Sequence, residues 1–74
     1  MSKRQRYAVE LLRAFDEEVV ATDPHIGATR LKRWMKNDNF IAAVEKRRQE
    51  PLGDLYMFEV VQMERELRED PDDQ

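Results

Sequence analysis

Hydrophobic residues recur every three or four positions along most of this chain, which is the spacing that places them on one face of a helix. The first such stripe lies in residues 3–20. The acidic run 16–18 interrupts it, so we expect a first helix that ends near Phe15 and a short second helix over about residues 17–22. No pair of strand candidates accompanies these stripes, and the pattern therefore favours an all-α fold.

A turn is expected after the second helix. Asp23 and Pro24 mark it, because proline in a helix interior removes a hydrogen bond and collides with the preceding turn. Gly27 follows closely, so residues 23–28 form either a turn or a single loose helical turn, with Asp23 as its cap. The chain changes direction here, and a third helix is predicted over about residues 29–37.

The cap-type residues 37–39 separate the third helix from a fourth. We expect the fourth helix to cover residues 40–49, with Asp38 or Asn39 as its N-cap. It ends at Glu50, because the residue before a proline disfavours helical geometry.

A last helix is predicted over residues 55–69, with Asp54 as its cap. Four of its apolar residues are spaced by four, three and four positions, as in the seam of a two-helix coiled coil. A weak homodimer through this seam is one expectation. Its members are Tyr56, Val60, Met63 and Leu67.

The 74 residues are enough for one small core. We expect a single-domain helical bundle of four to five short helices over residues 1–69. Residues 5–50 contain the first four helices, residues 54–69 are the C-terminal amphipathic helix, and residues 70–74 are a disordered acidic tail. The predicted core contains Leu11, Leu12, Phe15, Leu31, Trp34, Phe40, Ile41 and Val44.

Charge is distributed unevenly along the chain. Residues 1–50 carry eleven basic and eight acidic residues, whereas residues 51–74 carry two basic and eight acidic ones. The net charge is −3, yet the window 28–48 has seven basic residues against two acidic ones. A nucleic-acid-binding protein usually has a basic balance. Here the acidic C-terminal third opposes phosphate binding, although a local basic patch can still bind.

Little in the sequence supports catalysis. There is no cysteine and only one histidine, His25, so thiol chemistry and multi-histidine metal sites are excluded. The acidic clusters lack the spaced ligands and the turn glycine of a calcium loop. We therefore expect no enzyme activity, no metal and no cofactor. No apolar run is long enough to span a bilayer, and a cytoplasmic protein is expected (in the host cytoplasm if a phage encodes it).

The candidate contact residues are basic. Those of the third helix are Arg30, Lys32, Arg33 and Lys36, and those of the first helix are Arg4, Arg6 and Arg13. Four cations on about two helical turns repel one another unless phosphate, an acidic protein patch or the chain's own carboxylates offset them. The alternative is a simple solvated face. Trp34 is either core or a stacking platform, and its i+3 spacing from Leu31 favours core.

These residues resemble phage-type helix-turn-helix domains, including small terminase subunits and related phage regulators. The resemblance covers residues 5–50. It rests on Gly27-Ala28-Thr29, on Arg30-Leu31-Lys32-Arg33-Trp34 as the end of a recognition helix, and on the link Asn37-Asp38-Asn39-Phe40 before Ala43-Val44-Glu45. It implies a DNA-binding fold. A weaker resemblance, in size and acidic balance, is to small lytic-phage proteins that bind host RNA polymerase.

Three functional hypotheses follow. The first is a small transcription regulator that binds an RNA polymerase subunit and inhibits initiation or modulates termination. The second, ranked slightly lower, is sequence-specific DNA binding through the helix at residues 29–37, with Arg and Lys side chains contacting guanine edges and phosphates. The third is a structural adaptor that is held together by its last helix.

Overall fold

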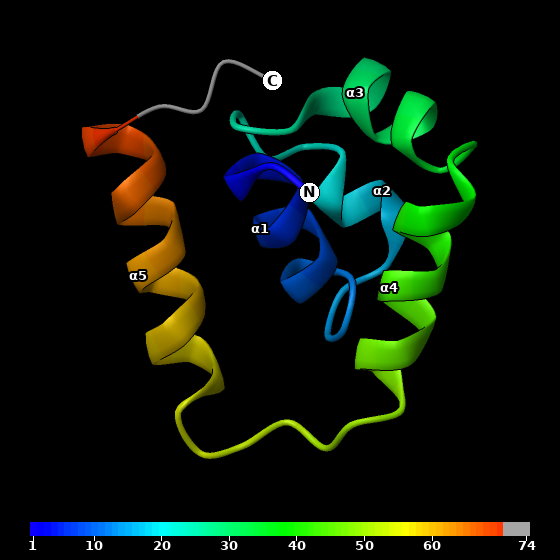
Figure 1. Cartoon of the computed structure of the whole chain (residues 1–74). Coiled ribbons are helices and arrows are strands. Elements are labelled where there is room, and N and C mark those ends of the chain that lie inside the picture. Colours follow the sequence, from blue (N-terminus) through cyan, green and yellow to red (C-terminus); the bar gives the residue numbers. More distant parts are fainter. Residues whose placement is uncertain (71–74) are drawn as a thin grey trace.

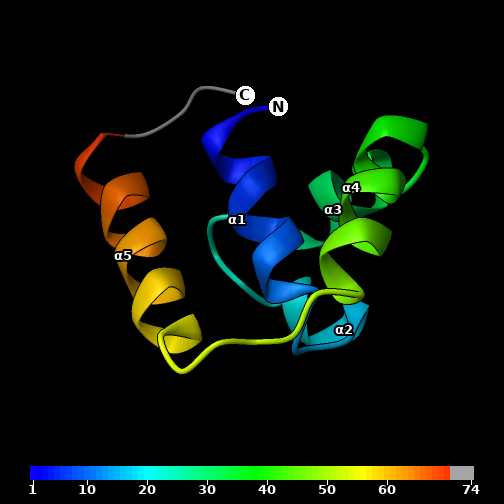
Figure 2. The same ribbon diagram turned by 60° about the horizontal axis from the view of Figure 1, so that its bottom comes forward.

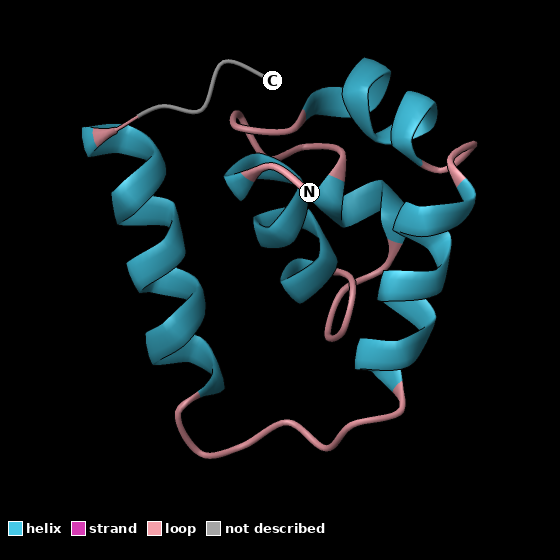
Figure 3. Ribbon diagram, viewed as in Figure 1, coloured by secondary structure: helices cyan, strands magenta, loops and turns pink. Residues whose placement is uncertain are grey.

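The computed structural model of the chain describes residues 1–70, and all the regular elements in that range are helices (Figure 1, Figure 3). The predicted all-α fold is therefore confirmed. The acidic tail expected at residues 70–74 lies, apart from Asp70, outside the described residues. The five helices are α1 (Lys3–Leu11), α2 (Glu17–Val20), α3 (Gly27–Trp34), α4 (Asp38–Arg48) and α5 (Tyr56–Glu69).

Helix α1 lies at the centre of the fold. It packs against α4 on one side and against α5 on another, while α2 packs against α3 (Figure 2). A capping box starts α1, because the Ser2 hydroxyl accepts a hydrogen bond from the Gln5 amide and the Gln5 side chain accepts one from the Ser2 amide. Ala8 is completely buried, so its small side chain permits close approach of the neighbouring helices.

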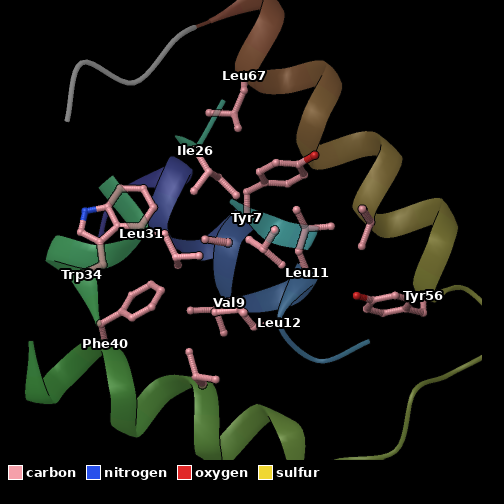
Figure 4. Packing of buried hydrophobic residues seen from close by; sticks show 14 residues of the cluster. Tyr7, Val9, Leu11, Leu12, Ile26, Leu31, Trp34, Phe40, Tyr56 and Leu67 are labelled. Carbon is pink, nitrogen blue, oxygen red and sulfur yellow. The ribbon is translucent and has the colours of Figure 1, made fainter. Parts of the chain in front are cut away.

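One cluster of buried hydrophobic side chains contains residues from all five helices (Figure 4). Six of the eight predicted core residues are buried, and Ile41 is half-buried. Phe15 is a wrong prediction, because its side chain is 39% exposed. The reason is that α1 ends at Leu11 and the chain turns over residues 12–15, so Phe15 leaves the buried stripe.

The predicted seam of α5 faces α1. Tyr56, Val60 and Leu67 are buried and Met63 is half-buried against the core. The four residues are therefore not the exposed surface that a homodimer through them requires. The spacing of these residues does predict the apolar face of α5, but α1 of the same chain covers this face.

Two predicted helix caps are wrong. The N-cap of α4 is Asn37, whose side-chain oxygen accepts hydrogen bonds from the amides of Asn39 and Phe40. The predicted caps Asp38 and Asn39 lie instead inside the first turn of this helix. Helix α5 has Leu55 as its N-cap, with no side-chain hydrogen bond there, so the predicted cap Asp54 does not serve.

None of the helices in the described part of the chain is long and apolar enough to cross a membrane.

Candidate nucleic-acid interface on α3

Helix α3 has a buried face and a charged face. Leu31 and Trp34 point into the core, and the Trp34 ring lies 5.7 Å from the Phe40 ring, centroid to centroid (Figure 4). The prediction that Trp34 belongs to the core is confirmed. On the opposite face, Lys32 is exposed, as is Lys36 in the turn directly after the helix, which leaves their ammonium groups available to a ligand.

The loop before α3 fixes where this helix begins. The Asp23 carboxylate accepts hydrogen bonds from the Tyr7 hydroxyl (2.7 Å) and from the His25 amide (2.8 Å). Ile26 is buried, and Gly27 then starts the helix with a φ of 77°, a conformation that favours glycine. Asp23 therefore connects this turn to α1 through Tyr7, and the buried side chain of Ile26 anchors the start of α3 in the core.

The four predicted contact cations lie on α3 and in the turn directly after it, where Lys36 follows the C-cap Met35. Lys32, Arg33 and Lys36 are exposed and Arg30 is half-exposed. Within residues 1–70, none of the four makes an ion pair or a side-chain hydrogen bond. None of these cations is therefore ion-paired with a carboxylate of the described chain, so each is available to an external anion.

Arg13, by contrast, is a structural residue rather than a contact residue. Its side chain is only 6% exposed and pairs with Glu10 at 2.8 Å. The guanidinium also donates to the carbonyls of Arg47 (3.1 Å), Glu50 (3.2 Å) and Pro51 (3.0 Å). It lies 5.6 Å from the ring centroid of Tyr56. The prediction of a partner contact at Arg13 is wrong, because each of its three guanidinium nitrogens donates a hydrogen bond within this chain and the side chain is buried.

Glu10 joins Arg13 to α4. Its carboxylate accepts hydrogen bonds from Arg47 Nε at 2.9 Å and from Arg47 Nη2 at 3.2 Å, and Arg47 also pairs with Glu50. Burial alone raises the carboxyl pKa, but the hydrogen bonds from Arg47 and Arg13 outweigh it and hold the pKa of Glu10 below its usual value. The Glu10 carbonyl also accepts a hydrogen bond from the Tyr56 hydroxyl. One residue thus connects α1, α4 and α5.

The other basic residues of α1 are arranged differently from those of α3. Lys3 forms an ion pair with Asp70 at 2.9 Å, and Arg6 donates to the Met1 carbonyl at 3.1 Å. Arg4 is half-buried. The candidates on the first helix therefore do not form a second exposed cationic row like that of α3.

Two hollows flank α3. One, of about 320 Å³, lies between α2 and α3, and its lining brings Glu17 and Glu18 close to Lys32. The other, of about 290 Å³, lies beyond the C-terminal end of α3 and is lined by the side-chain amides Gln5, Asn37 and Asn39. One flank is therefore acidic, and the other offers neutral hydrogen-bond donors.

A hydrogen bond that the sequence did not predict links the turn before α3 to α5. His25 Nε2 lies 2.8 Å from a Glu64 carboxylate oxygen, and the His25 ring meets the Tyr7 ring edge-on at 6.0 Å. The hydrogen bond from His25 lowers the pKa of the Glu64 carboxyl. His25 thus has a structural partner. Among the described residues, no group of three metal-ligating side chains occurs.

The connection between α2 and α3 differs from the short turn of most helix-turn-helix motifs. It covers residues 21–26, longer than the roughly three or four residues typical of that motif. Comparisons with protein-family models, curated proteins and solved structures find no match to this chain. The resemblance to phage helix-turn-helix domains consequently stays a hypothesis that rests on the sequence pattern.

Proposed function

We propose that this chain is a helix-turn-helix-type DNA-binding module that acts in transcription regulation, with the outward face of α3 as its contact surface. The observation that supports this most is the charge of Arg30, Lys32 and Arg33 on α3 and of Lys36 directly after it, which has no ion-pair partner within residues 1–70. Lysine and arginine are the side chains that neutralise backbone phosphates and bind guanine edges.

The position of α3 suits entry into a groove. Its buried face is fixed by Leu31 and Trp34, so the helix is presented as a rigid rod rather than as a mobile arm. An α-helix fits the major groove of B-DNA, and α2 packs against α3 as the first helix of such a motif does. The amides Asn37 and Asn39 at the end of α3 add donors that suit phosphate oxygens.

A second candidate is binding to an acidic patch of a protein such as RNA polymerase. Glu17 and Glu18 lie in the same hollow as Lys32, which makes this end of the surface mixed in charge. Mixed charge suits a protein partner better than a phosphate backbone, as does the net charge of −3. In this case the same cations of α3 are the contact residues.

The DNA proposal is tested by fluorescence anisotropy with a short labelled duplex at ~50 mM salt, where phosphate contacts are strongest. The full chain is expected to bind with a dissociation constant of about 1–100 µM. Each phosphate-contacting cation contributes about 0.9 to the slope of log affinity against log salt. The triple variant Lys32→Ala/Arg33→Ala/Lys36→Ala is therefore expected to lose binding and most of that slope.

Lys46→Ala is the matched control, because Lys46 is an exposed cation on α4 with no partner among residues 1–70. It is expected to retain almost all of the binding. No anisotropy change at 100 µM protein, a concentration at the weak end of non-specific DNA binding, would refute the DNA proposal. Capture of partners from a cell extract with and without nuclease then tests the second candidate, since a polymerase subunit retained after nuclease treatment is bound through protein.

A further inference from the structure

The side of α5 that faces away from α1 is apolar over its first two turns. The exposed fractions are 64% for Leu55, 55% for Met57, 68% for Phe58 and 47% for Val61. Phe58 and Val61 lie on the opposite side of the helix from the buried seam, with Leu55 and Met57 on either side of them, and Figure 1 shows no other helix beyond α5 on that side. An apolar patch of this kind on a small protein usually marks an interaction site.

A charged residue closes each end of this patch. Phe58, Val61 and Arg65 follow one another at spacings of three and four, so they form a row along α5. Asp54 lies in the turn directly before the N-cap Leu55, four positions ahead of Phe58, and continues this row beyond the start of the helix. Asp54 and Arg65 are exposed, and neither has an ion-pair partner within residues 1–70. The row reads acid, apolar, apolar, base. We call this row, with Leu55 and Met57 beside it, the outer face of α5.

We propose that the outer face of α5 binds a second copy of this chain, with the two α5 helices antiparallel. The two-fold axis passes between Phe58 and Val61. Each Phe58 then lies opposite Val61 of the other copy, and each Asp54 lies opposite Arg65 of the other copy. A two-fold interface uses the same surface on both partners, and this row is complementary to itself only when one copy is reversed.

The charges select this arrangement over its alternatives. A parallel pair would place the two Asp54 carboxylates together and the two Arg65 guanidinium groups together, which is unfavourable. The antiparallel pair also opposes the two helix dipoles favourably. In the same register, Met57 lies opposite Gln62 of the other copy, so no like charges meet beside the apolar centre.

This inference does not rest on the proposed function of α3. The outer face of α5 and the cationic face of α3 belong to different parts of the fold (Figure 2), so either one can fail alone. A patch of two helical turns is at the small end of specific interfaces, and the dimer is expected to be weak.

The test is sedimentation equilibrium of the full chain from roughly 10 µM to 1 mM, a range that covers weak association. Self-association is expected for the natural sequence. Phe58→Ser is expected to weaken it at least tenfold through loss of apolar burial. Val19→Ser is the control, because Val19 is an equally apolar residue that is 50% exposed on α2. A monomer at all concentrations, or equal effects of the two variants, overturns the proposal.

Charge reversal tests the antiparallel register. Asp54→Arg and Arg65→Asp each place like charges opposite one another twice in a dimer, so each variant alone is expected to associate about tenfold more weakly. An equal mixture of the two restores both attractive contacts and is expected to form heterodimers at least as strong as the natural dimer. A mixture that associates no better than either variant alone overturns the antiparallel register. Circular dichroism of each variant verifies that the fold is retained.

Discussion

At the scale of single residues, the main organising group is the carboxylate of Glu10. It pairs with Arg13 and Arg47, while its own carbonyl accepts from Tyr56. All these groups are partly or fully buried, so each of these hydrogen bonds contributes more to the stability of the fold than an exposed one would. Sequence periodicity made Arg13 a contact candidate because it lies off the apolar stripe of the predicted first helix. Its backbone-carbonyl partners are Arg47, Glu50 and Pro51, and helical spacing in the first helix carries no information about them.

Glu10→Gln is expected to lower the free energy of unfolding by about 2 kcal/mol at pH 7, because it removes charge-assisted hydrogen bonds to two arginines. The pKa of Glu10 is lower in the folded chain than its usual 4.5, so its contribution is fully present above that value. The contribution disappears as the pH falls through the folded-state pKa. The difference between variant and natural protein should therefore shrink between pH 7 and pH 3 in urea unfolding.

Glu45→Gln is the control for this pH series, since Glu45 is exposed and has no ion pair within residues 1–70. It should change stability by less than about 0.5 kcal/mol at either pH. A Glu10→Gln effect of the same size at pH 3 as at pH 7 would contradict the role of the carboxylate charge.

At the scale of elements, hydrophobic spacing predicted the five helices, and the division of the first stripe at residues 16–18 is confirmed by α2. What it could not supply was the neighbour of each helix. The spacing of Tyr56, Val60 and Leu67 identifies a face, but not whether α1 or a second chain covers it. The predicted N-cap of α4 was wrong by one or two residues, because all three residues of the run 37–39 are asparagine or aspartate, which cap equally well.

The start of α3 depends on Gly27, whose φ is 77°. A side chain there would meet no atom within 4 Å, so the cost of a substitution comes from the backbone alone. Gly27→Ala is expected to lower the free energy of unfolding by about 1 kcal/mol. Gly53→Ala is the matched comparison, because Gly53 also has open space but no left-handed φ, and this change should be neutral or slightly stabilising.

Urea unfolding of both glycine variants measures this difference directly. Equal effects would indicate that the conformation of Gly27 places no demand on the residue type. If the Gly27→Ala variant is still folded but binds DNA more weakly than the natural chain, the start of α3 also sets the geometry of the proposed contact surface.

At the scale of the whole molecule, α5 is attached differently from α4. It packs on α1, and a long connection, residues 49–55, separates it from α4 (Figure 1). Glu64 of α5 also contacts His25 in the turn before α3, and Asp70, directly after α5, pairs with Lys3. Trp34 and Phe40, by contrast, belong to the part of the core that the other four helices form around α1 (Figure 4).

We expect hydrogen exchange to reveal this difference. Amides in the middle of α5, such as those of Val60 and Met63, should exchange through a partial opening with a lower free energy than those of Ala8 and Leu11 in α1. Native-state exchange followed by NMR at low denaturant measures both sets. Identical exchange free energies across α1 and α5 would instead show that the chain opens as one cooperative unit.

The central position of α1 has a consequence for how the sequence can vary. Tyr7, Ala8, Val9, Leu11 and Leu12 are all buried, so this short helix is enclosed on more than one side. A change in any of them must suit two neighbouring helices at once, whereas α4 and α5 each keep one side open to solvent. We therefore expect new contact surfaces, and with them new partners, to arise by substitutions on the outer helices, whereas α1 tolerates the fewest substitutions during evolution.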